Sequence, residues 1–148
     1  MKPMNEMNIS FLSCSANEGF ARAVVAAFVA QLDPTIDELS DIKTAVSEAV
    51  TNCIVHAYRD MLGTIYISAK LYEDGSIQIR IRDKGCGIED VEKAREPLFT
   101  TAEGEERAGL GFAVMESFMD SVGVLSRVKK GTTVTLKKRL ARRRASNG

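Results

Sequence analysis

Apolar and polar positions along the first part of the chain predict one strand followed by two helices. Residues 7–12 alternate in part between apolar and polar side chains, which predicts a strand, and residues 17–32 follow with helical periodicity. Asp33-Pro34-Thr35 is expected to end that helix. Residues 37–58 then predict a longer, central helix with a single apolar face, made of Leu39, Ile42, Val46, Ala49, Val50 and Cys53.

The rest of the chain predicts two hairpins and one further helix. Residues 64–72 and 76–82 alternate with period two on either side of Asp74-Gly75. Residues 122–128 and 132–140 repeat this pattern, and residues 111–120 before them predict a helix. Strands in one sheet with helices gathered on one face predict an α+β fold, a two-layer α/β sandwich with a mixed, mostly antiparallel sheet. Residues 95–108 are polar and aperiodic, and are expected to form a flexible lid.

Composition limits the domain organisation and the classes of partner. The 148 residues leave room for one domain, expected over residues 1–140, with a basic and disordered tail over residues 141–148. Twenty basic and twenty acidic residues cancel, which gives no general attraction to nucleic acid or membranes. The three scattered cysteines suggest neither a disulfide framework nor a zinc site, and favour a cytoplasmic protein. The longest apolar stretch, residues 23–30, is too short to span a membrane.

The central helix carries a polar stripe. Glu48, Asn52 and His56 are spaced four residues apart, so their side chains project from one side of the helix, among apolar neighbours. A solvated helix face explains such a stripe equally well when it is considered alone. For His56, a satisfied structural histidine is the favoured interpretation.

Two glycine motifs point to a nucleotide. Asp83-Lys84-Gly85-Cys86-Gly87 follows a strand, where Asp83 could accept a hydrogen bond from the exocyclic amine of adenine while the glycines let the chain pass beside the base. Gly109-Leu110-Gly111 opens a helix, whose free N–H groups can hold phosphate oxygens. Asn52 offers a neutral oxygen ligand suited to Mg²⁺. An ordinary Asp-Gly turn and a glycine-rich helix start remain the alternatives for the two motifs.

The sequence lacks the motifs of other common nucleotide-binding and catalytic sites. The chain has no G-x-x-x-x-G-K-[ST] loop, no dinucleotide-binding glycine fingerprint and no protein-kinase signature set. It has no G-x-S-x-G motif, and His56 is its single histidine, which argues against a hydrolytic triad or a histidine-rich metal centre.

In combination the motifs resemble those of the GHKL ATPase superfamily, whose nucleotide-binding fold is the Bergerat fold. E-A-V-T-N-C-I-V-H at residues 48–56, D-K-G-C-G at residues 83–87 and G-L-G at residues 109–111 look like its N, G1 and G2 boxes, and Gly131-Thr132-Thr133 resembles its final box. The short chain excludes the multidomain branches. It resembles the stand-alone anti-sigma factor serine kinases, and residues 17–22, 26–35 and 97–101 look especially like the branch that acts on a sporulation sigma factor.

The resemblance implies a role for each motif residue, with ATP or ADP and Mg²⁺ as ligands. Glu48 is the candidate general base, or the group that orients a substrate serine, and Asn52 is the candidate Mg²⁺ ligand. Arg107, beside the glycine loop, could stabilise charge on the γ-phosphate, although a solvated lid charge is an equal alternative. The nucleotide itself is expected to contact Asn52, Asp83, Gly85, Gly87, Thr100, Thr101, Gly109, Leu110, Gly111 and Thr132.

The resemblance also implies partners. Such proteins inhibit a sigma factor by binding it, phosphorylate an anti-anti-sigma factor on serine, and typically act as dimers. Glu18 and Arg22, one helical turn apart, are implied as partner contacts, and a plain surface ion pair is the simpler explanation of their spacing. The alternative functions are a nucleotide-gated binding module without catalysis and another stand-alone anti-sigma kinase of the same family.

Overall fold

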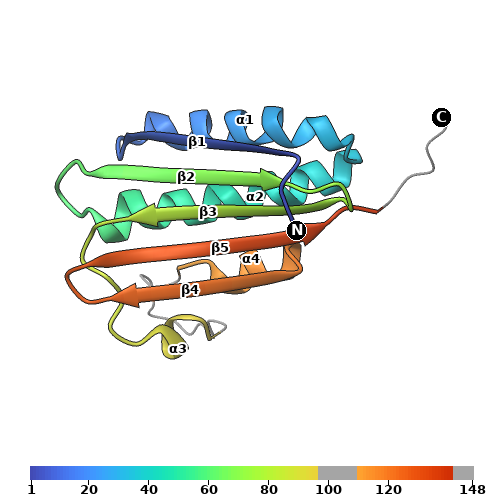
Figure 1. Ribbon diagram of the computed structural model, residues 1–148. Helices are drawn as coiled ribbons and strands as arrows, with labels where there is room; N and C mark the ends of the chain where they lie inside the picture. The colour runs from blue at the N-terminus through green and yellow to red at the C-terminus, as the bar shows by residue number, and fades with distance from the viewer. Residues whose placement is uncertain (97–109, 142–148) are drawn as a thin grey trace, which may run out of the picture.

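A five-stranded antiparallel sheet forms one layer of the molecule (Figure 1). The computed structural model describes residues 1–96 and 110–141. The order across the sheet is β1-β2-β3-β5-β4, and all four neighbouring pairs are antiparallel. The strands are β1 (Asn5–Leu12), β2 (Thr64–Leu71), β3 (Ser76–Asp83), β4 (Ser121–Arg127) and β5 (Gly131–Arg139).

Helices form the second layer and cover one face of the sheet (Figure 1). They are α1 (Ala16–Val29), α2 (Ile36–Asn52) and α4 (Phe112–Phe118), while the short α3 (Val91–Ala94) has no counterpart in the predicted elements. Every second residue of β2 is buried against this layer, and β3 repeats the alternation. The structure therefore confirms the α+β two-layer sandwich and both predicted hairpins. In the described residues the predicted, mostly antiparallel sheet is antiparallel throughout.

Local sequence explains where the first two helices end and begin. After α1 a 3₁₀ turn, η1 (Ala30–Leu32), leads to Asp33, whose φ of 55° is left-handed and stops the helix. Thr35 then caps α2: its hydroxyl accepts from the Glu38 N–H at 3.0 Å, and the Glu38 carboxylate accepts from the Thr35 N–H at 2.9 Å. This reciprocal pair satisfies two of the backbone donors that every helix start leaves unpaired.

The predicted central helix is divided into two parts. Regular α-helix ends at Asn52, and residues Cys53–Ala57 form a π-helical turn, η2, in which the Tyr58 N–H donates to the Cys53 carbonyl at 3.0 Å. At the end of this turn the Ala57 carbonyl accepts from the Cys86 N–H at 3.1 Å. The helix thus ends by binding the loop that follows β3. Wide turns of this kind are frequent at functional sites.

Two predicted segments lie almost wholly outside the described residues: the lid over residues 95–108, apart from residues 95 and 96, and the tail over residues 141–148, apart from Ala141. No helix among the described residues is both long and apolar enough to cross a membrane.

Candidate functional site

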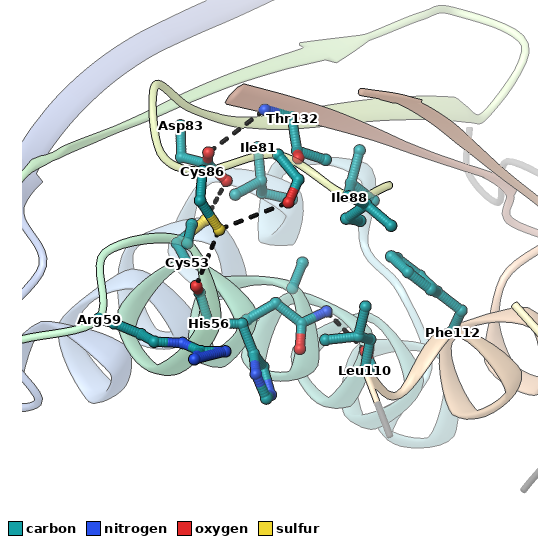
Figure 2. Close-up of a pocket in the computed structure, with 15 residues that line it drawn as sticks. Cys53, His56, Arg59, Ile81, Asp83, Cys86, Ile88, Leu110, Phe112 and Thr132 are labelled. Atoms are coloured by element: carbon teal, nitrogen blue, oxygen red, sulfur yellow. Dashed lines mark hydrogen bonds between the residues drawn. The ribbon is translucent and has the colours of Figure 1, made fainter. Parts of the chain in front are cut away.

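A cavity of about 210 Å³ opens between the end of α2, the turn η2, the ends of β3 and β5 that lie together, and the start of α4 (Figure 2). It brings together five of the residues that the sequence predicts for a nucleotide site: Asn52, Asp83, Gly87, Leu110 and Thr132. These come from four separate stretches of the chain. The fold alone makes them neighbours.

Asp83, at the end of β3, is the most buried polar side chain at the cavity, with 6% of its surface exposed. Its Oδ1 accepts from the Gly85 N–H at 2.9 Å and from the Thr132 N–H at 3.2 Å. Among the described residues, its Oδ2 receives only the weak thiol donor of Cys53, at 3.5 Å. Burial raises the pKa of Asp83, although these three hydrogen bonds act in the opposite direction. The carboxylate is fixed, and one of its oxygens still lacks a strong donor.

Thr132 pairs directly with Asp83 across β3 and β5. Its hydroxyl lies 2.7 Å from the Ser126 Oγ, and that oxygen also accepts from the Ile88 N–H at 2.8 Å. Thr132 therefore holds Asp83 through its backbone N–H, while its hydroxyl belongs to a network with β4. The sequence predicted a nucleotide contact for Thr132, which stays a prediction. The structure adds a backbone role that the sequence did not reveal.

Asn52 lies at the last turn of α2 and lines the cavity. Its Nδ2 donates to the Leu110 carbonyl at 2.6 Å. This hydrogen bond fixes the orientation of the amide, because only the nitrogen can donate to a carbonyl. The Oδ1 atom is thereby left as a neutral oxygen ligand at the cavity, which is the donor type that Mg²⁺ takes.

Glu48 lies one helical turn before Asn52, but outside the cavity wall, against the start of α4. A side chain at Gly111, whose φ is 70°, would overlap the Glu48 carboxylate, so this glycine leaves the space that the carboxylate occupies. Glu48 is half-buried, and burial raises its pKa. The carboxylate is consequently more basic than that of a free glutamate.

The glycines after Asp83 are required by the packing of the chain itself. A side chain at Gly85 would overlap the Ala57 carbonyl, and one at Gly87, whose φ is 80°, would overlap the Arg127 carbonyl. Gly87 lines the cavity, whereas Gly85 lies behind it. Gly85 thus supports the cavity indirectly: it lets the loop approach η2, and its N–H donates a hydrogen bond to Asp83.

Several lining residues were not singled out from the sequence. Cys53, next to Asn52, is buried, and its pKa is raised by burial first and by Asp83 second. Further apolar walls come from Ile81, Ile88, Phe112 and Val134. Ile81 could have been found, since it lies two residues before Asp83 on the same face of β3. His56, which the sequence did single out and for which a structural role was favoured, also lines the cavity, and burial together with Arg59 lowers its pKa.

Glu18 and Arg22 lie away from the cavity on α1. They form an ion pair at 2.5 Å, and the Ser47 hydroxyl of α2 donates to the same Glu18 oxygen. The pair is therefore tied to the residue before Glu48. Thr100, Thr101, Arg107 and Gly109 lie outside the described residues, and their predicted roles stay predictions.

Comparison with known proteins identifies the family. Residues 15–138 match the model of the histidine kinase-like ATPase domain. An anti-sigma F factor of Caldanaerobacter subterraneus is 59% identical over 144 residues, which cover 97% of this chain and all of that protein. Another from Geobacillus thermodenitrificans is 57% identical over 142 residues, which cover 95% of this chain and 97% of that protein. The chain belongs to the anti-sigma F factor family.

A solved structure supports the fold of this anti-sigma F factor family member. The crystal structure of the RsbU and RsbW domains of a Mycobacterium tuberculosis protein superposes with a TM-score of 0.70 at 23% identity. The match covers 95% of this chain and 33% of the mycobacterial one. The family's ATPase-type domain implies nucleotide binding, and the observed donor set fits a nucleotide: Asp83 Oδ2 is buried without a strong donor, and the cavity around it is largely apolar.

Mg²⁺ also fits the residues present. Within the described residues no group of three or more histidine, cysteine or acidic side chains is placed to hold a metal ion. A Mg²⁺ ion bound by phosphates needs only one or two protein ligands, because it keeps several of its waters. Asn52 Oδ1 is suited to be that single ligand.

Proposed function

We propose that this chain is an ATP-dependent serine kinase that binds and inhibits a sporulation sigma factor and phosphorylates the corresponding anti-anti-sigma factor on serine. The observation that carries the kinase proposal is the position of Glu48, whose carboxylate occupies the space left by Gly111 one turn from Asn52. A module that only binds nucleotide does not need such a carboxylate. The names of the relatives support the sigma-factor part of the proposal.

Asp83 recognises the base in this proposal. Asp83 lines the cavity, and within the described part of the chain its Oδ2 accepts only from a thiol. This oxygen can therefore take the exocyclic amine of adenine, which a guanine does not offer at the same place. The Thr132 and Gly85 N–H groups keep the carboxylate from rotating. This arrangement favours ATP over GTP because the acceptor is fixed before the nucleotide enters.

Asn52 and Glu48 divide the remaining chemistry. Asn52 would hold Mg²⁺, which neutralises phosphate charge when bound. Glu48 would accept the hydrogen bond of the incoming serine hydroxyl, orient its oxygen, and take its proton on a carboxylate oxygen late in the transfer. The raised pKa of Glu48 makes it a better proton acceptor than a fully solvated glutamate, since its affinity for a proton is higher.

Further parts of the proposal concern residues beyond this geometry. Arg107 would stabilise charge on the γ-phosphate, and Thr100, Thr101 and Gly109 would contact the nucleotide from a lid. Glu18 and Arg22 would contact the partner proteins, which is compatible with their place on α1, linked through Ser47 to the helix that carries Glu48. We also propose a homodimer, a cytoplasmic location, one domain over residues 1–140 and a separate tail.

A comparison of phosphotransfer with nucleotide binding tests the proposal. Glu48→Gln keeps the shape of the side chain and removes its basicity, so we expect transfer to the anti-anti-sigma protein to fall by about 100-fold or more, with Mg-ATP affinity nearly unchanged. Glu92→Gln, on the exposed side of α3, is the control and should retain both properties. Equal transfer by Glu48→Gln would exclude the proposed role of Glu48. Mg-ATP binding without any transfer by the wild type would favour the rival function, a nucleotide-gated module that acts by sequestration.

A further inference from the structure

Five cationic side chains surround a second hollow, on the open side of the sheet at the left-hand ends of β3, β4 and β5 in Figure 1. The hollow has a volume of about 580 Å³, and its cations are Arg82, Lys84, Arg127, Lys129 and Lys130. It shares Asp83 and Thr132 with the nucleotide cavity, so the paired ends of β3 and β5 form a wall common to both.

The charge of this hollow is not balanced locally. Over residues 1–96 and 110–141, none of the five cations takes part in an ion pair. Among the described residues that line the hollow, the single carboxylate belongs to Asp83, which is buried and accepts hydrogen bonds from Gly85 and Thr132. Arg82 and Lys84 lie over the Tyr66 ring, at 4.7 and 5.2 Å from its centroid. A chain with zero net charge thus carries a concentrated positive surface, which attracts anions at this place.

The backbone that presents the cations is fixed. The Lys129 N–H donates to the Cys86 carbonyl at 2.7 Å, and the Lys130 N–H donates to the Arg127 carbonyl at 2.9 Å. A fixed turn lowers the cost of ordering the surface when a ligand binds. The same bonds leave neither N–H free. Sites for phosphate normally offer free backbone N–H groups, so the turn is poorly suited to a small phosphorylated ligand.

Apolar side chains accompany the cations. Leu125 lines the hollow with 78% of its surface exposed, and Val128, in the same turn as the lysines, is 51% exposed. Phosphate polymers gain nothing from an exposed leucine, whereas a protein segment can cover it with an apolar side chain of its own. In the part of the lining that the structure describes there is no aromatic ring on which a nucleic-acid base could stack, since the Tyr66 ring lies against Arg82 and Lys84 and is not part of the lining.

We propose that this hollow, defined by Arg82, Lys84, Leu125, Arg127, Lys129 and Lys130, is a docking site for an acidic segment of a partner protein, in which carboxylates flank an apolar side chain. The carboxylates pair with the cations, and the apolar side chain covers Leu125. The site lies on the opposite side of the Asp83–Thr132 wall from the nucleotide cavity, so the partner segment does not need to enter that cavity.

Fluorescence anisotropy with a labelled peptide that carries glutamates on both sides of one leucine tests this assignment. The double variant Arg127→Glu with Lys130→Glu reverses two exposed charges, and we expect it to bind the peptide about tenfold or more weakly than the wild type. Lys93→Glu with Lys137→Glu changes the net charge equally away from the hollow and should bind as the wild type does. If the first variant fails to fold, as judged by circular dichroism and thermal unfolding, Lys130→Glu alone serves the same test.

Three competitors distinguish the class of ligand. We expect a peptide without the leucine, an inorganic polyphosphate and a short DNA duplex all to compete more weakly than the leucine peptide. No measurable binding to the wild type, equal weakening in both double variants, or stronger competition by polyphosphate or DNA would each overturn the proposal. Equal binding of the peptide without leucine would overturn the role of Leu125.

Discussion

The side chain of Asp83 is held in place by a residue that is distant in the sequence. The place of Asp83 after a strand and before two glycines, combined with the other motifs, led to the prediction of an adenine contact. The sequence did not reveal that Thr132, 49 residues later, donates its backbone N–H to the same carboxylate oxygen. That bond depends on the pairing of β3 with β5, which no local pattern encodes. The sequence therefore led to the prediction of a base contact, which stays a prediction, but not to the hydrogen bonds that hold the Asp83 side chain.

Replacing Asp83 by asparagine tests its proposed contact with the base. The amide oxygen can still accept from Gly85 and Thr132, but the other position becomes an N–H₂ group, which opposes the amine of adenine. We expect Mg-ATP affinity, measured by calorimetry, to fall by about tenfold or more. Asp120→Asn removes a carboxylate that accepts from the Arg139 N–H, far from the cavity, and should leave the affinity unchanged. Wild-type affinity in Asp83→Asn would exclude the base contact.

The same variant has a pH signature, because burial raises the pKa of Asp83 in the folded protein. Between the ordinary pKa and the raised pKa, the folded state keeps the proton of Asp83 while the unfolded chain has lost it. The free energy of unfolding of the wild type therefore falls as the pH rises through this window. Asparagine does not titrate. We expect urea unfolding to show Asp83→Asn gaining stability relative to the wild type across that window. A difference that is constant with pH would contradict the burial argument.

The relative positions of Glu48 and Asn52 could be predicted largely without knowledge of the tertiary structure. Their spacing on one helix already predicted a common side, and the structure places both where α2 meets the start of α4. The sequence did not reveal that Gly111 leaves the space for the Glu48 carboxylate, or that burial raises its pKa. Both facts arise from contact between helices that are far apart in the chain.

At the scale of elements, the periodic segments were predicted well and the irregular ones poorly. Each predicted strand and helix of the described residues exists, with ends shifted by a few residues. The π-turn η2 was not predicted, because residues 53–57 have the same apolar pattern as an ordinary helix end. The insertion of β5 between β3 and β4 was not predicted either, since a hairpin pattern fixes only its own pair of strands. These two features build the cavity.

The close contact between η2 and the loop after β3 yields a prediction at this scale. Gly85→Ala places a methyl group on the Ala57 carbonyl and displaces the Cys86 N–H that binds it at 3.1 Å. We expect a loss of about 1 to 3 kcal/mol in the free energy of unfolding, measured with urea, together with weaker nucleotide binding.

Gly123 provides the matched control. A methyl group there would lie 3.9 Å from its nearest neighbour, the Thr135 Cβ, in ordinary contact. Gly123→Ala should therefore leave the unfolding free energy within about 0.5 kcal/mol of the wild type, or raise it slightly, because alanine restricts the unfolded chain. If both variants lost the same stability, the loss could not be assigned to the contact at Ala57.

The whole molecule places two candidate sites on the two sides of one wall. Between the sheet and its helices, the cavity beside Asp83 fits a nucleotide, and Glu48 lies at the adjoining start of α4. On the open side of the sheet, the basic hollow fits an acidic protein segment. The net charge of zero gave no sign of this hollow, because a net charge does not show where on the surface the positive and negative side chains lie. Motifs predicted the first site, and only the assembled sheet showed the second.

We propose above all that this protein transfers phosphate from ATP to a serine of a partner protein. The most direct test incubates it with Mg-ATP labelled on the γ-phosphate and an extract of a spore-forming bacterium, and then identifies the labelled amino acid. We expect phosphoserine on one small protein, and no label when Glu48→Gln replaces the wild type. Nucleotide binding without any labelled protein, or label on histidine or threonine instead, would contradict the claim.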